Sequence, residues 1–348
     1  MGAAGKVFVG MKGQRKGKLI LLSVSHLLVD GICAAALFGH EEIPLTNALL
    51  IYNTMAFTTQ CLTGMLPDRY GRGRLWVLLS AGMLACGALV PMPVLAQAVV
   101  IGLGNSLFHV SGGWLTLRGS DGMAPLGVFV APGAIGLFLG TAFPRLRLPF
   151  TFLFAALAVL LAAAGSRSGE AEREFPPESP ENHTIPERER TLLAAMLLIA
   201  VAARAVGGSV VLFPWKTGFT AGFILVLAVF LGKTCGGFLA DRAGIRTAAV
   251  LSVAAASVLI VAGQNWMLPS VIGQFALNLS MPVTLYLLYR LFPDSPGFAF
   301  GLAASALWPG TLAGKLIHLT GIWAGFLAIL CFLAGLAAIL ITERRLKQ

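Results

Sequence analysis

The sequence has little charge for its length. Only 11% of the 348 residues are charged, whereas 57% are hydrophobic and the mean hydropathy is +0.83. A soluble domain is typically about 25% charged, so these charges are too few to solvate a protein of this size. The composition therefore excludes a soluble enzyme, a disordered tail and a nucleic-acid-binding module. We interpret the net charge of +10 first in terms of a membrane.

Cysteine is also scarce. The five cysteines all lie inside apolar runs and form no CxxC pair, so they predict packing residues and not a disulfide scaffold. The sequence further lacks a nucleotide-binding loop, a metal-ligand cluster and a nucleophile–base motif. We therefore expect no enzymatic activity, no cofactor and no metal.

Twelve apolar runs follow one another along the chain. A bilayer core about 30 Å thick needs about 20 helical residues per span, and short breaks rich in proline, glycine and charge separate runs of about this length. The predicted spans are 19–39, 44–65, 75–94, 96–116, 123–143, 148–164, 191–213, 218–239, 247–263, 268–289, 297–316 and 321–341.

The basic residues divide unequally between the two faces of this topology. Of the 25 Lys and Arg residues, 20 lie in the tails and in loops on one side, and Lys233 is counted among them. Only Arg145, Arg147 and Lys216 lie on the other side. Cytoplasmic loops carry the excess of Lys and Arg. The sequence thus predicts a multi-pass protein of the plasma (inner) membrane with both termini cytoplasmic, which requires an even number of spans.

A polar stretch separates the apolar runs into two sets of six. It holds seven of the fifteen acidic residues and four prolines, as expected for a linker. The predicted organisation is a cytoplasmic tail over 1–17, a six-helix bundle over 18–165, a cytoplasmic linker over 166–190, a six-helix bundle over 191–341 and a cytoplasmic tail over 342–348.

Two similar segments follow the second and the eighth apolar run. The segment GMLPDRYGRGR begins at Gly64 and GFLADRAGIR begins at Gly237, and both contain G-x-L-x-D-R-x-G followed by basic residues. Almost half the chain separates the aspartate of the first copy, Asp68, from that of the second, Asp241. Internal repeats of this kind are common in transporters.

The repeated segment resembles the loop signature of the major facilitator superfamily, and the span number, topology and linker extend the resemblance over the whole chain. It implies the major facilitator fold, an all-α membrane protein with twelve transmembrane helices in two pseudo-symmetric six-helix bundles. Both carboxylates would then lie near helix ends and basic side chains and hold the cytoplasmic side closed in one state. A solvated turn that only sets the topology is the alternative. The gating residues implied here are Gly64, Asp68, Arg69, Gly71, Arg72, Asp241 and Arg242.

A second signature lies in the fifth run. GVFVAPGAIG, which begins at Gly127, resembles the antiporter signature G-x-x-x-G-P-x-x-G-G, with Ala131 and Ile135 at two of its glycine positions. Glycine and proline there permit the close packing and the bend that a rocking helix needs, so Pro132 is a further gating candidate. An ordinary kinked helix is the alternative. The arginine of the superfamily's proton-antiport motif is missing ahead of Gly102.

One acidic residue lies inside an apolar run. Asp30 is within the first span, and a carboxylate at this depth costs several kcal/mol unless it is paired, hydrated or protonated. His26 lies four residues earlier, on the same helical face, and a histidine beside a carboxylate can relay protons. We predict that Asp30 and His26 couple transport to protons. A packed, hydrogen-bonded histidine and a static pair between Asp30 and Arg204 are the alternatives.

Two cations also lie inside apolar runs, Arg204 and Lys315. The spacing from Asp30 to Arg204 matches that from Asp68 to Asp241 to within one position, so we expect Asp30 and Arg204 to face a central cavity from opposite sides. Lys315 is near the end of its span and is expected to snorkel. For the remaining buried polar side chains, helix–helix hydrogen bonding is the alternative to ligand binding. The predicted substrate-binding residues are Arg204, His109, Asn53, Asn105, Gln274 and Asn278.

Two short strings narrow the resemblance. SHLLVDG from Ser25 and GLGNSLFH from Gly102 are similar to the H-x-x-x-D and G-x-G-x-x-x-F-H segments of the fosmidomycin-resistance-type drug exporters. This implies a secondary active transporter that exports a small molecule in exchange for protons by alternating access. We expect a monomer whose partners are its substrate, protons and the lipid bilayer, with no nucleic acid. The alternatives are uptake or exchange of a small organic anion held by Arg204 and His109, and a receptor-like member that does not transport.

Overall fold

The computed structural model describes residues 13–40, 45–119, 122–167 and 185–348, and within these ranges it contains helices and no strand. The acids Glu41, Glu42 and Asp121, the start of the first tail and residues 168–184 of the predicted linker lie outside the described residues.

The first half of the described chain contains α2 (Gly13–Phe38), α3 (Leu45–Asn53), the π-helix η1 (Thr54–Thr58), α4 (Gln60–Tyr70), α5 (Gly73–Leu89), α6 (Val94–Gly119), α7 (Ala124–Val130), α8 (Pro132–Ala142), the 3₁₀ turn η2 (Pro144–Leu146) and α9 (Arg147–Arg167). The second half contains α10 (Glu187–Val210), α11 (Gly218–Ala243), α12 (Ile245–Val261), α13 (Met267–Asn278), α14 (Met281–Leu291), α15 (Pro296–Leu316) and α16 (Gly321–Leu346).

Each of the twelve predicted apolar runs is helical over most of its described length. Eight helical segments of the described chain are long and apolar enough to cross a bilayer, and α5 and α12 are apolar but shorter. Three runs are interrupted: 44–65 is divided into α3, η1 and α4, 123–143 into α7 and α8, and 268–289 into α13 and α14. Twelve transmembrane spans remain a prediction.

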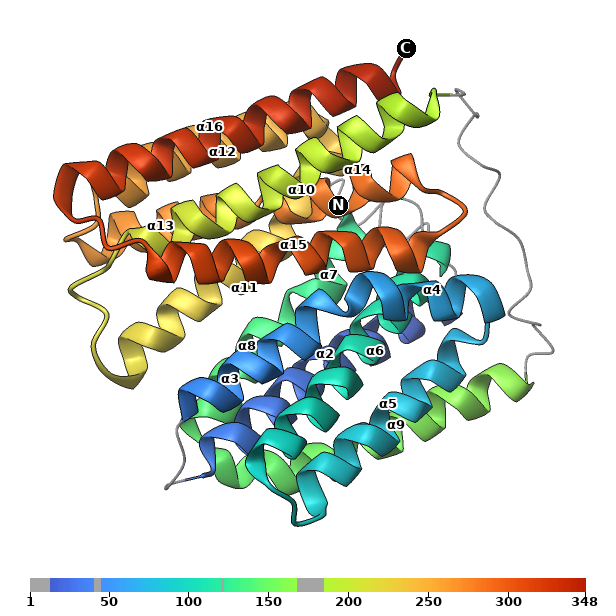
Figure 1. Ribbon diagram of the computed structural model, residues 1–348. Coiled ribbons are helices and arrows are strands. Elements are labelled where there is room, and N and C mark those ends of the chain that lie inside the picture. Colours follow the sequence, from blue (N-terminus) through green and yellow to red (C-terminus); the bar gives the residue numbers. More distant parts are fainter. Residues whose placement is uncertain (1–12, 41–44, 120–121, 168–184) are drawn as a thin grey trace.

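The helices fall into two groups that follow the order of the chain. In Figure 1, α2 to α9 lie together in one part of the molecule and α10 to α16 in the other, with α4 beside α15 and α7 beside α11 where the groups meet. Glycines bring the backbones close at both places, since a Cβ on Gly64 would lie 2.6 Å from the Gly297 carbonyl carbon and one on Gly237 would lie 2.7 Å from Ala124 Cα. The two repeated segments thus take part in two helix contacts between the groups.

The repeated glycines end their helices in the same way. Gly71 follows α4 and has φ 63°, and Gly244 follows α11 and has φ 87°. A residue with positive φ commonly terminates a helix, and glycine adopts this conformation without steric cost. Each glycine lies three positions after the aspartate of its own segment, so the repeat recurs in backbone geometry as well as in sequence.

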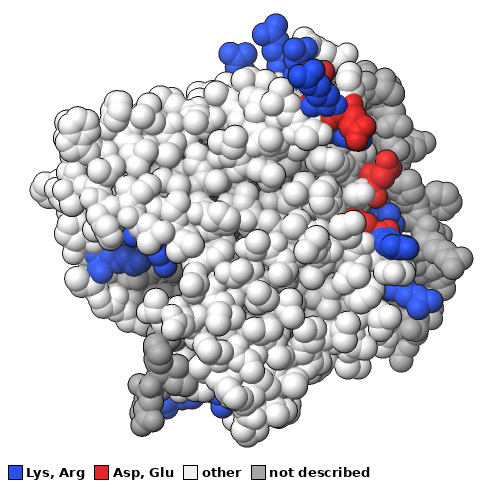
Figure 2. All heavy atoms as spheres, in the orientation of Figure 1, with Lys and Arg blue, Asp and Glu red and all other residues white. Residues whose placement is uncertain are grey.

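Charge is confined to the edges of the face shown in Figure 2. Acidic and basic side chains gather along the edge near the C-terminus, and smaller basic patches lie toward the opposite edge. The broad surface between them is uncharged in this view, and many exposed side chains are large and apolar, including Phe152, Ile199 and Leu333. An apolar band between two charged rims is what a protein embedded in a bilayer requires.

Candidate functional site

Asp30 lies at the centre of a polar cluster in the N-terminal group of helices. Its Oδ2 is 3.3 Å from His26 Nε2 and its Oδ1 is 3.6 Å from His109 Nε2. Asn105 Nδ2 donates a hydrogen bond of 2.9 Å to Oδ1. The structure therefore brings together four of the predicted site residues, from α2 and α6.

The two histidines are oriented by main-chain carbonyl groups. His26 Nδ1 donates to the Phe129 carbonyl oxygen (2.8 Å), and His109 Nδ1 donates to that of Asn105 (2.9 Å). Because a carbonyl oxygen only accepts, each Nδ1 carries a proton and each Nε2 is the position that can gain or lose one. The side chains of His26 and His109 are 5% and 10% exposed and that of Asp30 is 20% exposed, so the carboxylate is the accessible member of the cluster.

A cation that the sequence sorting assigned to the cytoplasmic loops belongs to this region. Lys233 lies inside α11, in a candidate membrane span, and is close enough to interact electrostatically with Asp30, His109 and Arg204. The loop assignment of Lys233 is therefore wrong. The signal was present in the sequence, because Lys233 lies within the predicted span 218–239.

Three groups of the cluster could also coordinate a metal. His26, Asp30 and His109 each offer one ligand atom, and these atoms lie within 4.8 Å of one another. Two imidazoles and a carboxylate are ligands that divalent transition metals accept. Lys233, however, would repel a divalent cation bound by these atoms. A proton carries one positive charge instead of two and would be repelled less.

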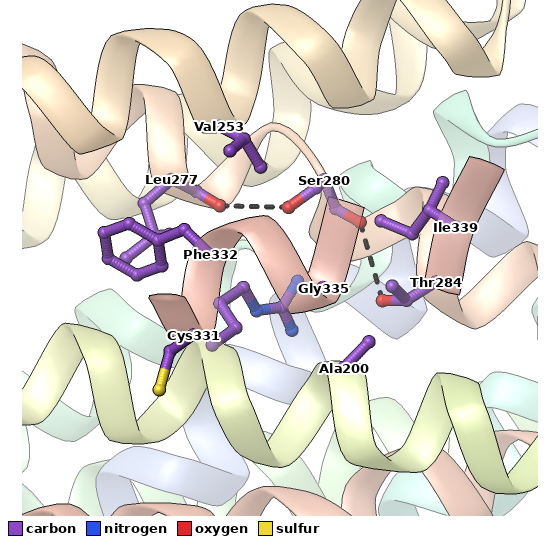
Figure 3. Close-up of a pocket in the computed structure, with 10 residues that line it drawn as sticks. Ala200, Val253, Leu277, Ser280, Thr284, Cys331, Phe332, Gly335 and Ile339 are labelled. Carbon is purple, nitrogen blue, oxygen red and sulfur yellow. Dashed lines mark hydrogen bonds between the residues drawn. The ribbon is translucent and has the colours of Figure 1, made fainter. Parts of the chain in front are cut away.

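Arg204 lies apart from Asp30, in the C-terminal group of helices. It lines a cavity formed by α10, α12, α13, α14 and α16, and most of the other lining side chains are apolar. Figure 3 shows the cavity residues Leu277, Ser280 and Thr284 joined by local hydrogen bonds of 3.2 and 3.5 Å. These hydroxyl groups already donate to main-chain carbonyls. The cavity's free volume of about 20 Å³ has room for a water molecule but not for a substrate.

Among the described residues, no acid forms an ion pair with the Arg204 guanidinium. Its Nη1 is buried and has no hydrogen-bond partner among the described residues, and no ion pair joins Arg204 to Asp30 there. An unpaired buried charge carries a large desolvation penalty. The Nη1 group of Arg204 is therefore a buried donor without an acceptor in the described part of the chain.

The remaining predicted substrate residues are not part of the Asp30 cluster. Asn53 Nδ2 donates to the Leu49 carbonyl oxygen (2.7 Å), and Asn278 Nδ2 donates to that of Gln274 (2.9 Å). Gln274 is buried in α13. Both asparagine bonds run to the residue four positions earlier in the same helix, so neither is a bond between helices, and ligand binding by these residues stays a prediction.

Both repeated aspartates bind the start of a helix in the other group. Asp68, near the end of α4, accepts hydrogen bonds from Gly297 N–H (2.9 Å) and Phe298 N–H (2.7 Å) at the start of α15. Asp241, near the end of α11, accepts from Met123 N–H (2.7 Å) and Ala124 N–H (2.8 Å) at the start of α7. A carboxylate is stabilised there by unpaired amides and by the helix dipole.

The other predicted gating residues lie in different places. Gly64 lies against Gly297, and the Arg69 guanidinium lies 5.6 Å from the Tyr70 ring centroid. Arg72 follows Gly71 in a left-handed conformation, with φ 55°. Arg242 is exposed beside Asp241, and Pro132 is the first residue of α8.

Comparison with known proteins identifies the fold only. No protein-family model matches the chain, and no curated protein matches its sequence. A crystal structure of FucP, a transporter of the major facilitator superfamily in the outward conformation, matches with a TM-score of 0.67 at 12% identity. The match covers 93% of this chain and 98% of FucP. A variant of the E. coli fucose:proton symporter FucP matches with a TM-score of 0.67 at 11% identity and the same coverage.

The chain therefore has the fold of the major facilitator superfamily transporters. The matched structures are of transporters and not of enzymes. At 11–12% identity the likeness concerns the fold alone, and it does not distinguish the fosmidomycin-resistance-type exporters from other transporters with this fold.

Proposed function

We propose that this protein is a secondary active transporter that exports a small molecule in exchange for protons by alternating access. It would be a monomer of the plasma (inner) membrane, with twelve spans in two six-helix bundles and both termini cytoplasmic. The observation that carries the proposal is the partly buried carboxylate of Asp30, faced by two histidines and an amide in a chain with a transporter fold.

In this mechanism Asp30 and His26 hold the coupling proton between them. A carboxylate in a membrane is expensive when charged and unpaired, so its proton occupancy changes with its surroundings. Opening to one side hydrates the carboxylate and favours its charged form, and closing around it favours protonation or pairing with His26. His109 and Asn105 adjust this balance because both also face Asp30.

The gate consists of the two aspartates and the helix starts that they bind. Each carboxylate joins the two groups of helices at one end of the molecule, through the α4–α15 and α7–α11 contacts. Breaking both sets of hydrogen bonds would allow that end to open. We propose that this end is the cytoplasmic one and that the described conformation faces outward.

Transport in proteoliposomes tests the proposal. A thermal-shift screen on the purified protein would identify a ligand, since a ligand that prefers the folded state raises its apparent stability. Flux of that ligand is then measured with an imposed pH gradient in the wild type, in Asp30→Asn and in the control Asp294→Asn, which lies between α14 and α15. We expect the gradient to drive flux in the wild type and the control but not in Asp30→Asn. Full gradient-driven flux in Asp30→Asn would exclude Asp30 as the coupling group.

A second function is favoured by the buried Nη1 group of Arg204, which has no partner among the described residues. Uptake or exchange of a small organic anion would supply the acceptor that Arg204 lacks, and Lys233 adds a second positive charge nearby. The variant Arg204→Lys distinguishes anion uptake or exchange from proton-coupled export. Lysine cannot form the bidentate pair that arginine makes with a carboxylate or phosphonate, so an anion exchanger should lose ligand binding. Unchanged ligand binding in Arg204→Lys would exclude the anion exchanger. A receptor-like protein that does not transport would show no saturable flux at all.

A further inference from the structure

The broken helix of the fifth run touches the Asp30–His26 pair directly. Phe129 lies in the last turn of α7, where main-chain carbonyls lack partners within the helix. Its carbonyl oxygen accepts the hydrogen bond from His26 Nδ1 at 2.8 Å. Pro132 begins α8 and has no N–H to donate, so the break leaves terminal carbonyls of α7 available.

Gly133 brings α8 onto the same pair. A Cβ at this position would lie 2.5 Å from His26 Nε2 and 2.7 Å from His26 Cδ2, and it would also overlap Asp30 Oδ2. Any side chain larger than hydrogen would therefore displace the two groups that face each other at 3.3 Å. Phe129 thus binds the Nδ1 side of the imidazole, and Gly133 packs against its Nε2 side.

The opposite end of α7 is held by the gate. Met123 and Ala124, at its start, donate their N–H groups to Asp241. A helix of seven residues is about 10 Å long. In its middle, Gly127 packs against the Lys233 carbonyl group of α11. A single short helix thus connects the imidazole of His26 with the carboxylate of Asp241.

We propose that Phe129, Pro132 and Gly133 are positioning residues for His26, and that α7 transmits the proton occupancy of the His26–Asp30 pair to the Asp241 gate. The proposal rests on the proton coupling proposed above. His26 lies on α2, and its Nδ1–H bond to Phe129 joins α2 to α7. When Nε2 is also protonated, Asp30 holds the imidazolium, and the bond to Phe129 is strengthened because its donor is charged. After loss of the Nε2 proton, a lone pair faces the carboxylate, the bond to Phe129 has a neutral donor and weakens, and α7 can move away from Asp241.

The charged and titratable groups around the pair come from several helices. His109 of α6 and Lys233 of α11 interact electrostatically with Asp30, as do Cys33 of α2 and Tyr52 of α3. The α8 segment that packs on the pair contains no titratable side chain. Lys233 and Asp30 both interact electrostatically with His109.

Hydrogen–deuterium exchange of the full-length protein in nanodiscs tests the proposal without a substrate. The probe is pH alone, and exchange of segment 122–131 is corrected for the intrinsic pH dependence of amide exchange. In the wild type we expect the Met123 and Ala124 amides to exchange about tenfold faster at alkaline than at acidic pH, equivalent to about 1.4 kcal/mol. In Gly133→Ala and in His26→Gln this pH response should be lost.

The matched control is Gly82→Ala, because a Cβ at Gly82 meets no atom within 4 Å. It should keep the full pH response. His26→Gln removes the imidazole without adding bulk at α8, so it tests the proposal even if Gly133→Ala fails to fold. The proposal is overturned if the wild type shows no pH response in this segment, or if His26→Gln retains it.

The same experiment separates this proposal from the proposed function. Wild-type protein that shows the pH response but no gradient-driven flux would contradict proton-coupled export and leave the connection through α7 supported. Gradient-driven flux without any pH response in α7 would overturn the connection and leave proton-coupled export supported.

Discussion

The two groups of helices treat their buried charges in opposite ways. In the N-terminal group, Asp30 is faced by His26, His109 and Asn105 at distances from 2.9 to 3.6 Å. In the C-terminal group, the corresponding Arg204 has a buried Nη1 without a partner among the described residues. Two charges at the repeat spacing therefore differ in their partners, because Asp30 has three polar neighbours and the Nη1 group of Arg204 has none in the described part of the chain.

This difference suggests a division of labour between the two groups. A charge with partners can change its proton occupancy without unfolding the helices around it. A charge without partners is ready to meet a ligand of opposite sign, since binding then recovers a desolvation penalty already incurred. Under the function proposed above, proton coupling belongs to the N-terminal group and recognition of a charged ligand to the C-terminal group. The following variants test this comparison.

The largest effect is expected for Asp30→Leu. Removing one partner of a buried polar cluster commonly costs about 3–5 kcal/mol, because the remaining groups stay buried and unsatisfied. His26, His109 and Asn105 would all lose their shared acceptor. Thermal or chemical unfolding in detergent should show this loss of stability, and an unfolding free energy unchanged from the wild type would contradict the pairing.

Arg204→Leu should change stability in the opposite direction. Replacing a buried charge by an apolar side chain of suitable volume often stabilises a protein by about 1–4 kcal/mol, and the cavity already contains Leu277, Phe332 and Ile339. The variant should unfold at higher temperature than the wild type and bind no anionic ligand. Destabilisation similar to that of Asp30→Leu would remove the contrast between the two groups.

Removal of either gate aspartate should have a similar effect, although the buried charges of the two groups of helices differ. Asp68→Ala and Asp241→Ala each remove hydrogen bonds to two helix-starting amides, and a bond to a charged group is worth about 1.5–3 kcal/mol. Hydrogen–deuterium exchange should become faster at Gly297 and Phe298 in the first variant and at Met123 and Ala124 in the second. Asp294→Ala is the control. A strong effect in only one of the two aspartate variants would show that the halves differ at the gate as well.

The smallest effect is expected for Ser305→Ala. Ser305 Oγ on α15 lies 3.2 Å from the Phe57 carbonyl oxygen and 3.3 Å from that of Thr58, both in the π-helical turn η1. Ser305 and Pro132 are separated by the same number of positions as Asp241 and Asp68. Pro132 lies at the break between α7 and α8, and Ser305 contacts the π-helical break between α3 and α4. Loss of these contacts should reduce stability by about 1 kcal/mol. Ser209→Ala, which removes only a local bond to Ala205, provides the reference, and an equal loss in both variants would argue against a specific role of Ser305.

Much of the architecture was predictable because it depends on local properties. Membrane association follows from the scarcity of charge, and helix ends follow from glycines such as Gly71 and Gly244. The repeated Asp68 and Asp241 were found from the sequence pattern alone. The grouping of His26 with Asp30 was also predictable, since residues four apart share one face of a helix.

The partners of these residues were not predictable in the same way. Asn105 reaches Asp30 across 75 positions, and Asp68 reaches Gly297 across 229, so both contacts depend on which helices pack together. Spacing suggested that Arg204 faces Asp30, whereas the structure places Lys233 within electrostatic reach of both. The assignment of basic residues to loops misplaced Lys233 because it counts the positive charges on each side of the membrane and does not consider how deep each one lies in its span.

The sequence by itself determined that this is a helical membrane protein with a duplicated aspartate segment, because hydropathy and repeat spacing are properties of the chain. Only the tertiary structure decided that a broken helix, α7, joins His26 at one end and Asp241 at the other. The physical reason is that hydrogen bonds to main-chain carbonyls and amides depend on backbone positions. The identities of the side chains do not determine these backbone positions, and only the packing of the helices brings the donors and acceptors within hydrogen-bond distance.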